Sequence, residues 1–138
     1  MKKIVFICKG NMHRSPIAAA LYNSFKKDDS FAESYGTMVN VEGRTGQKLS
    51  SFPTIAIFIK ILKDAYGIDI SNHVCAQVVP SVLDGVDKII MIAQDDSIPD
   101  WLRSYKYVKW ELPDPEFMTE EDAKKDIKGI KAKVESLF

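Results

Sequence analysis

The stretch that most constrains the fold lies near the N-terminus, where a buried strand leads almost directly into a helix. The run from Lys3 to Ile7 is continuous and rich in β-branched residues, which predicts a strand buried on both faces of a parallel sheet. A helix is predicted from Pro16 to Phe25, because proline suits a first helical turn and an apolar, alanine-rich run follows it. Such a pair indicates an α/β protein with a mainly parallel sheet.

Strands and helices alternate along the rest of the chain. We predict further strands at 32–35, 86–92 and 105–110, and further helices from Pro53 up to Gly67, at 99–104 and from Thr119 onward. A loop rich in glycine and threonine is expected between Gly36 and Ser51, and Thr119 with Asp122 forms a capping box for the last helix. No internal repeat, low-complexity tract or linker interrupts the pattern, so residues 1–138 are expected to form a single domain.

The charge balance and the hydropathy pattern exclude some classes of function. Nineteen basic residues balance nineteen acidic ones, which argues against binding to nucleic acid or to an anionic membrane by bulk charge. The N-terminal apolar run is too short for a signal peptide. The run from Ile55 to Leu62 contains Lys60 and is far too short to span a membrane. We therefore expect neither nucleic acid nor a membrane among the partners.

The cysteine content indicates the compartment. Cys8 and Cys75 are the only cysteines, and two thiols do not make a disulfide framework for a chain of this size. A reducing cytosol is the simplest interpretation, so we expect a cytoplasmic protein, either a monomer or a weak homodimer, in which both thiols stay available.

The loop between the first strand and its helix carries the chemistry. It reads Cys8-Lys9-Gly10-Asn11-Met12-His13-Arg14-Ser15-Pro16. Ligand sites in open α/β sheets lie at the carboxyl ends of strands, and a helix start offers unpaired N–H groups and the positive end of a dipole. Gly10 and Asn11 best tolerate left-handed backbone angles, so successive N–H groups can turn inward to form an anion-binding nest.

Three side chains of this loop suit phosphoryl transfer. Cys8 beside such N–H groups is expected to be a thiolate that attacks without a general base. Arg14 can hold two phosphoryl oxygens in a bidentate grip, and the Ser15 hydroxyl can donate a hydrogen bond to the sulfur as it departs. The alternative is a buried core cysteine beside a surface arginine, since free cysteine is often buried.

A general acid is expected at Asp114. Pro113 and Pro115 restrict the backbone on both sides of it. Asp114 would protonate the departing oxygen and then deprotonate the water that hydrolyses the phosphocysteine. The alternative is a simple Asp-Pro turn, which is common.

These residues resemble the low molecular weight protein tyrosine phosphatase family over nearly the whole chain. The matching stretches are Val5 to Ala18 for its phosphate loop, Ser34 to Thr37 after its second strand, Gly67 to His73 ending in a structural histidine, Asp87 to Met91 for a core strand, and Asp114-Pro115 for its acid loop. The resemblance implies a three-layer sandwich, with helices on both faces of a mainly four-stranded parallel sheet. It also implies a phosphocysteine intermediate and neither a metal nor another cofactor.

The resemblance assigns roles to particular residues. The phosphate-binding loop comprises Lys9, Gly10, Asn11, Met12, His13 and Ser15. Ser34 and His73 support it, in a hydrogen-bond network with Asn11 and Ser15. Asn40 and Phe117 are expected to line the substrate pocket.

The sequence departs from the family in four places. His13 stands where many members carry a second cysteine, so Cys8 lacks that partner against overoxidation. The acid loop reads Asp-Pro-Glu-Phe where relatives often have Asp-Pro-Tyr-Tyr, and Asn40 stands where an aromatic residue is often found. The stretch from Arg44 to Gly67 is longer than usual. These changes alter the rim of the pocket and leave the reacting residues untouched.

The leading interpretation is a phosphomonoester hydrolase that acts on a phosphorylated protein, through phosphotyrosine, or on a small aryl phosphate. Arsenate reductases of the same fold are an alternative, although they relay oxidation through two further cysteines and only Cys75 is available here. Further alternatives are a phosphate- or phosphoprotein-binding module without turnover and a carrier that keeps phosphate on its cysteine. Arg14 and Asp114 argue against storage and for hydrolysis.

Overall fold

The protein has a central sheet of four parallel strands in the order β2-β1-β3-β4. We describe it from a computed structural model, over residues 2–112 and 119–138. The strands are β1 at Lys3–Cys8, β2 at Phe31–Gly36, β3 at Lys88–Met91 and β4 at Val108–Lys109. β1 is therefore central, and its last residue pairs in register with the end of β2, since Cys8 lies opposite Gly36.

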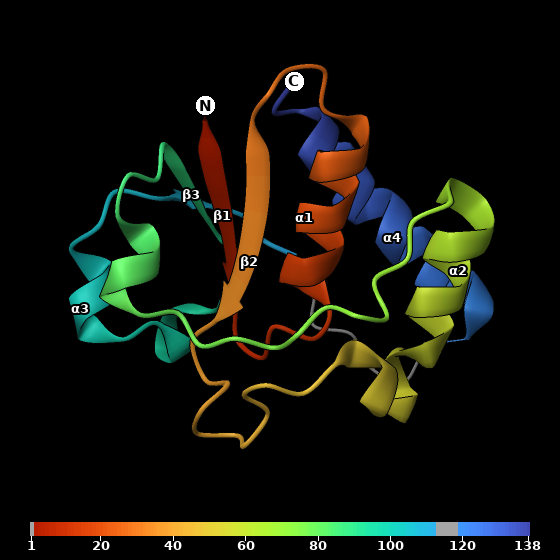
Figure 1. Cartoon of the computed structure of the whole chain (residues 1–138), viewed down its shortest axis with the longest axis horizontal. Helices are drawn as coiled ribbons and strands as arrows, with labels where there is room; N and C mark the ends of the chain where they lie inside the picture. Colours follow the sequence, from red (N-terminus) through yellow and green to blue (C-terminus); the bar gives the residue numbers. More distant parts are fainter. Residues whose placement is uncertain (1, 113–118) are drawn as a thin grey trace.

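Helices cover both faces of this sheet (Figure 1). α1 at Arg14–Phe25 and α4 at Glu120–Glu135 pack on one face, and α2 at Ala56–Tyr66 lies against α4. The opposite face carries α3 at Asp100–Arg103 and a 3-10 turn at Pro80–Leu83. Further 3-10 turns lie at Leu49–Ser51, Pro53–Ile55 and Asp95–Ser97. The predicted α/β sandwich with a four-stranded parallel sheet is confirmed.

The continuous apolar run of β1 fills two cores at once. Phe6 packs toward the helices of one face, in a cluster with Leu21 of α1 and Ile127 of α4. Val5 and Ile7 point to the other face, in a cluster with Leu102 and other apolar side chains. Fully burying one such side chain contributes roughly 1.5–3 kcal/mol, so β1 is a firm base for the loop that follows it.

Several element boundaries differ from the sequence-based prediction, among them the start of α1 and both ends of β4. α1 begins at Arg14 rather than at Pro16, so the proline lies within the first turn, where its missing N–H is not needed. β4 spans two residues, Val108–Lys109, instead of the predicted 105–110. The cause is the turn that ends α3, in which the Tyr105 N–H donates to the Leu102 carbonyl.

The other helix signals correspond to the observed elements. The chain makes a 3-10 turn at Pro53–Ile55 before α2, which ends at Gly67 with a left-handed φ of 69°. The Thr119 hydroxyl caps α4 by accepting from the Asp122 N–H at 3.2 Å. Over the described residues, none of the helices is both long and apolar enough to cross a membrane.

Candidate active site

Cys8 lies at the carboxyl end of the central strand and faces the start of α1. Its sulfur is buried and lies 2.9 Å from the Ser15 hydroxyl oxygen. The Asn11 backbone N–H donates to the same sulfur at 3.3 Å. Both groups can donate hydrogen bonds to the sulfur and so stabilise negative charge on it.

The start of α1 is suited to an anion. Its N-cap residue is His13, which makes no side-chain cap hydrogen bond, and no acidic residue lies in the first turn. The N–H groups of a first helical turn have no partner within the helix. Together with the helix dipole they form a site at which phosphate binds readily.

Asn11 is the central brace of the loop. It is fully buried and has a positive φ of 54°. Its Nδ2 donates to the hydroxyls of Ser15 at 2.9 Å and Ser34 at 3.0 Å. Its Oδ1 accepts from the Ala76 N–H at 3.0 Å and lies 2.9 Å from Nε2 of His73. The structure thus brings together the four side chains that the resemblance assigns to one network.

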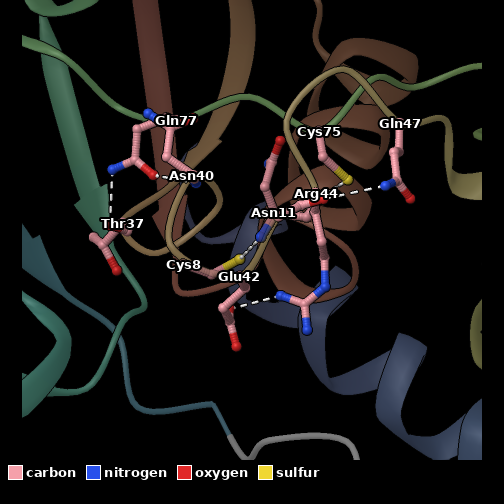
Figure 2. A network of polar contacts seen from close by, with 10 residues as sticks. Cys8, Asn11, Thr37, Asn40, Glu42, Arg44, Gln47, Cys75 and Gln77 are labelled. Carbon is pink, nitrogen blue, oxygen red and sulfur yellow. Dashed lines mark hydrogen bonds and ion pairs between the residues drawn. The ribbon is translucent and has the colours of Figure 1, made fainter.

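The segment around His73 and Cys75 packs against the loop at Asn11. Burial lowers the pKa of His73, so its imidazole is neutral at neutral pH, and Nε2 carries the proton because an amide oxygen only accepts. The Cys75 thiol donates to the Asn11 carbonyl at 3.4 Å. Figure 2 shows Asn11 between the two sulfurs, with Cys8 on one side and Cys75 on the other.

The turn after β2 packs directly against the loop. A Cβ atom on Gly36 would lie 2.7 Å from the Lys9 carbonyl oxygen and 2.9 Å from the Asn11 nitrogen. The Thr37 N–H donates to the Cys8 carbonyl at 2.9 Å. Only glycine allows two backbone segments to approach this closely, so Gly36 is needed for the turn after β2 to pack against residues 9–11.

Arg14 is buried where the sheet strands end. Its Nη1 donates to the Leu112 carbonyl at 3.3 Å and to the Ile92 carbonyl at 3.5 Å. These bonds hold the guanidinium at the carboxyl ends of β3 and β4, on the same edge of the sheet as Cys8. A guanidinium in this position presents planar N–H donors of the kind that bind phosphoryl oxygens.

The rim includes a pair that sequence reasoning missed. Arg44 and Glu42 form an ion pair with an Nη1–Oε1 distance of 2.6 Å, and a Cβ on Gly10 would lie 3.2 Å from the same Nη1. Figure 2 shows both side chains in front of the loop. Lys9 is exposed at the same rim. Nothing in the sequence pattern indicated that the chain after β2 returns over Gly10.

The structure describes some of the remaining predicted site residues and not others. Met12 is half-buried and packs against the core. Asn40 is exposed, and its side-chain oxygen accepts from the Thr45 hydroxyl, so it stabilises its own loop. Asp114 and Phe117 lie outside the described residues. Among the residues that the structure describes, no group of three or more His, Cys, Asp or Glu side chains is arranged to hold a metal ion.

His13 has a partner that the sequence did not reveal. Its Nε2 lies 2.6 Å from Oδ2 of Asp126 on α4, and both side chains are buried. The Phe58 ring of α2 packs edge-on against the imidazole, with 4.4 Å between ring centroids. The two residues are 113 positions apart in the chain, so only tertiary structure could identify the pair.

The site combines a buried thiol at the end of the central strand, a backbone amide and a hydroxyl within hydrogen-bond distance of its sulfur, and a buried arginine. This combination is typical of a cysteine-dependent phosphatase. The family model described as low molecular weight phosphotyrosine protein phosphatase matches residues 3–138. The chain therefore belongs to the low molecular weight protein tyrosine phosphatase family, and it is a phosphatase that acts on phosphorylated substrates.

Solved structures share this fold. A low molecular weight protein tyrosine phosphatase from T. tengcongensis superposes with a TM-score of 0.78 at 25% identity, over 99% of this chain and 97% of that one. An arginine phosphatase from Geobacillus stearothermophilus gives 0.76 at 19% identity, over 99% and 90% of the two chains. A thioredoxin-dependent arsenate reductase from Corynebacterium glutamicum gives 0.71 at 22% identity, over 99% and 60%. No curated protein sequence matches the chain.

Proposed function

We propose that Cys8 is the nucleophile, Arg14 the phosphate clamp and Asp114 the general acid and base of a two-step phosphomonoester hydrolysis. In the first step the Cys8 thiolate attacks phosphorus. The bond to the leaving oxygen breaks, and that oxygen takes a proton from Asp114. In the second step a water molecule gives a proton to Asp114 and attacks phosphorus, and the S–P bond breaks to release phosphate.

The observation that carries this proposal is the position of the Cys8 sulfur. It lies 3.3 Å from the Asn11 nitrogen and 2.9 Å from the Ser15 oxygen, at the start of a helix without a side-chain cap. In the proposed reaction, the Asn11 amide and the N–H groups at the start of α1 stabilise the equatorial oxygens of the phosphoryl group in the transition state. Ser15 stabilises the sulfur when it becomes the leaving group.

The substrate is proposed to be a phosphotyrosine side chain of a protein or a similar aryl phosphate. A nucleophile that is buried at the carboxyl end of β1 requires a phosphoryl group on a long side chain. The Glu42–Arg44 ion pair lies beside Gly10 of this loop, and the neighbouring Lys9 is exposed. A rim with both signs of charge favours peptide substrates whose flanking residues are charged.

One assay tests the mechanism. Purified protein is expected to hydrolyse p-nitrophenyl phosphate without added metal, and Cys8→Ser is expected to abolish this turnover. Unchanged turnover in Cys8→Ser would exclude the cysteine mechanism. Absence of turnover in the parent protein, together with tight binding of inorganic phosphate, would favour a binding module. Arsenate-dependent consumption of an external thiol would instead favour the arsenate-reductase alternative.

The setting of the enzyme is proposed from its cysteines and charge. Cys8 and Cys75 are both free thiols in the structure, and a thiolate nucleophile requires a reducing compartment such as the cytoplasm. The balanced charge gives no bulk attraction to nucleic acid or to an anionic membrane. We propose a monomer or weak homodimer, which sedimentation at several protein concentrations would test.

A further inference from the structure

A groove lies along the free edge of the sheet, outside the phosphate loop. β2 is the outermost strand on this side, and the groove is lined by β2, by α1 and by the segment at 69–76. Figure 1 shows this green segment crossing beside α1 and β2. The groove has a volume of about 460 Å³, and ligand pockets commonly measure about 300–1,000 Å³. It is therefore large enough to hold a ligand.

The backbone of β2 alternates between its two edges. The Phe31 N–H donates to the Lys2 carbonyl at 3.0 Å, so the odd-numbered residues of β2 form the ladder with β1. Successive residues of a strand that pairs on one edge direct their N–H and C=O groups to opposite edges. The residues of β2 that direct these groups to the outer edge are Ala32, Ser34 and Gly36.

Two of these three residues have partners on the outer edge. The Asn23 side chain bonds to both backbone groups of Ala32, at 2.8 and 2.9 Å. Gly36 exchanges two hydrogen bonds of 2.9 Å with the segment at 76–78. Over the residues that the structure describes, no hydrogen bond reaches the outward N–H or C=O of Ser34, which lines the groove. The middle of this edge therefore offers one backbone donor and one backbone acceptor.

The walls of the groove are small and apolar. α1 lines it with Pro16, Ala19 and Ala20, and such short side chains leave the space beside the strand open. The opposite wall includes Ile70 and Val74, and the Val74 side chain is 44% exposed. An apolar side chain that enters the groove would be removed from water, which favours binding.

The charged residues of the groove are acidic. Its described lining includes Glu33 and Asp69 but neither lysine nor arginine. Glu33 is paired with Lys3 at 2.7 Å, whereas Asp69 is exposed and accepts from the Ser71 N–H at 2.9 Å. Hydrogen bonds from Ser71 lower the pKa of Asp69, so this carboxylate is ionised at neutral pH. The groove therefore favours a partner with positive charge.

We propose that this groove binds an extended peptide segment of a partner protein, in which an apolar residue is flanked by basic ones. The middle residue of the segment pairs its own N–H and C=O with those of Ser34, as when a strand is added to a sheet edge. Its side chain then lies on the same face of the sheet as that of Ser34. This is the face on which Ala32 packs with α1, so the side chain enters the space beside Ala20.

The length of the bound segment is limited by the partners at both ends of the edge. From Ala32 to Gly36 the strand rises about 13 Å, at about 3.3 Å per residue. The free part of the edge between these two residues therefore has room for about three residues of an extended peptide. Binding at this groove does not require the proposed hydrolysis.

The test uses the blocked peptide acetyl-Lys-Val-Lys-amide and the amide NMR signals of isotope-labelled protein. Two hydrogen bonds and one valine provide little binding free energy, so we expect a Kd on the order of 1 mM. The signals of Ser34, Ala20 and Val74 should shift along one saturation curve. Methylation of the valine nitrogen removes the donor to the Ser34 carbonyl and should weaken binding at least about tenfold. Acetyl-Glu-Val-Glu-amide should also bind more weakly, because of its charge.

A variant tests the place of binding. Ala20→Leu fills the groove from α1 and is expected to weaken peptide binding at least about tenfold, with p-nitrophenyl phosphate turnover unchanged. Ala132→Leu is the matched control, because Ala132 is an exposed alanine of α4 outside the groove lining. It should keep both peptide binding and turnover. Saturating inorganic phosphate should not displace the peptide, because phosphate binds at the loop between β1 and α1.

The other outcomes would overturn the proposal. These are no saturable shifts up to about 10 mM peptide, equal affinity of the N-methylated peptide, equal or tighter binding of the glutamate peptide, or undiminished binding to Ala20→Leu. Displacement by inorganic phosphate would place the peptide at the phosphate loop and would overturn it too. If the parent protein binds the peptide as described but does not hydrolyse p-nitrophenyl phosphate, the proposed hydrolysis fails and the peptide groove is supported.

Discussion

Replacement of Asn11 by alanine is expected to disrupt both the stability of the protein and its activity. The side chain of Asn11 makes four contacts within 3.0 Å, to Ser15, Ser34, His73 and the Ala76 backbone. Each neutral hydrogen bond contributes about 1 kcal/mol, so their loss lowers the free energy of unfolding by about 4 kcal/mol. Alanine at a φ of 54° adds about 1–2 kcal/mol of strain.

The sum is a large share of the free energy of unfolding of a typical domain, which is roughly 5–15 kcal/mol. Asn11→Gly separates the two contributions, because glycine loses the same hydrogen bonds without the strain. We expect Asn11→Gly to be about 1 kcal/mol more stable than Asn11→Ala. Both variants are expected to lose at least about a hundredfold in kcat/KM, because the loop no longer holds the Asn11 amide and the Ser15 hydroxyl against the Cys8 sulfur.

Urea unfolding and steady-state hydrolysis of p-nitrophenyl phosphate measure these effects. Asn23→Ala is a matched control, because the Asn23 side chain makes two partly buried hydrogen bonds to the backbone of Ala32. Its Nδ2 donates to the Ala32 carbonyl at 2.9 Å, and its Oδ1 accepts from the Ala32 N–H at 2.8 Å. That variant is expected to lose about 2 kcal/mol of stability and no activity. If Asn11→Ala lowers the free energy of unfolding by less than about 1 kcal/mol, the four hydrogen bonds of Asn11 do not stabilise the loop as proposed. Equal stability of the alanine and glycine variants would refute the left-handed backbone.

Three further predictions concern the same loop and its surroundings. Gly36→Ala places a Cβ 2.7 Å from a backbone oxygen of the loop and is expected to lower kcat/KM about a hundredfold. An enzyme that stays active in Gly36→Ala would contradict the close packing of Gly36 against the loop. Gly129→Ala is the control, because its Cβ meets nothing within 4 Å, and it should stabilise α4 by about 0.5–1 kcal/mol. Hydrogen peroxide is expected to inactivate the enzyme by oxidising Cys8, with poor recovery on adding thiol. Burial raises the pKa of the Cys75 thiol, so Cys75→Ala should follow the same time course, and full recovery in the parent would refute this. Burial also lowers the pKa of His73, so the unfolded chain gains a proton there at higher pH than the folded protein does. Stability should therefore fall as pH drops below about 6.5, more steeply than in His73→Gln; parallel urea midpoints across that range would argue against a buried neutral imidazole.

Local patterns were enough to predict the architecture and the reacting loop. The apolar run before Cys8 indicated a strand that is covered on both faces of the sheet. The predicted helix begins only a few residues after this strand, so the N–H groups of its first turn were expected to lie near the strand's carboxyl end. Gly10 and Asn11 marked the turn between them. The prediction was wrong for the ends of β4, because the turn after α3 takes up Tyr105, and for the starting residue of α1, which is Arg14.

The sequence by itself determined the order of strands and helices, the position of the Cys8–Arg14 loop between β1 and α1, and the types of residue in that loop. These depend on hydrophobic periodicity and backbone preference, which act over a few residues. Only the tertiary structure decided which distant groups hold that loop. Asp126 against His13, Cys75 against the Asn11 carbonyl and Arg44 over Gly10 each join segments that the chain separates by tens of residues. Such contacts arise from the packing of helices on the sheet, and no local pattern records them.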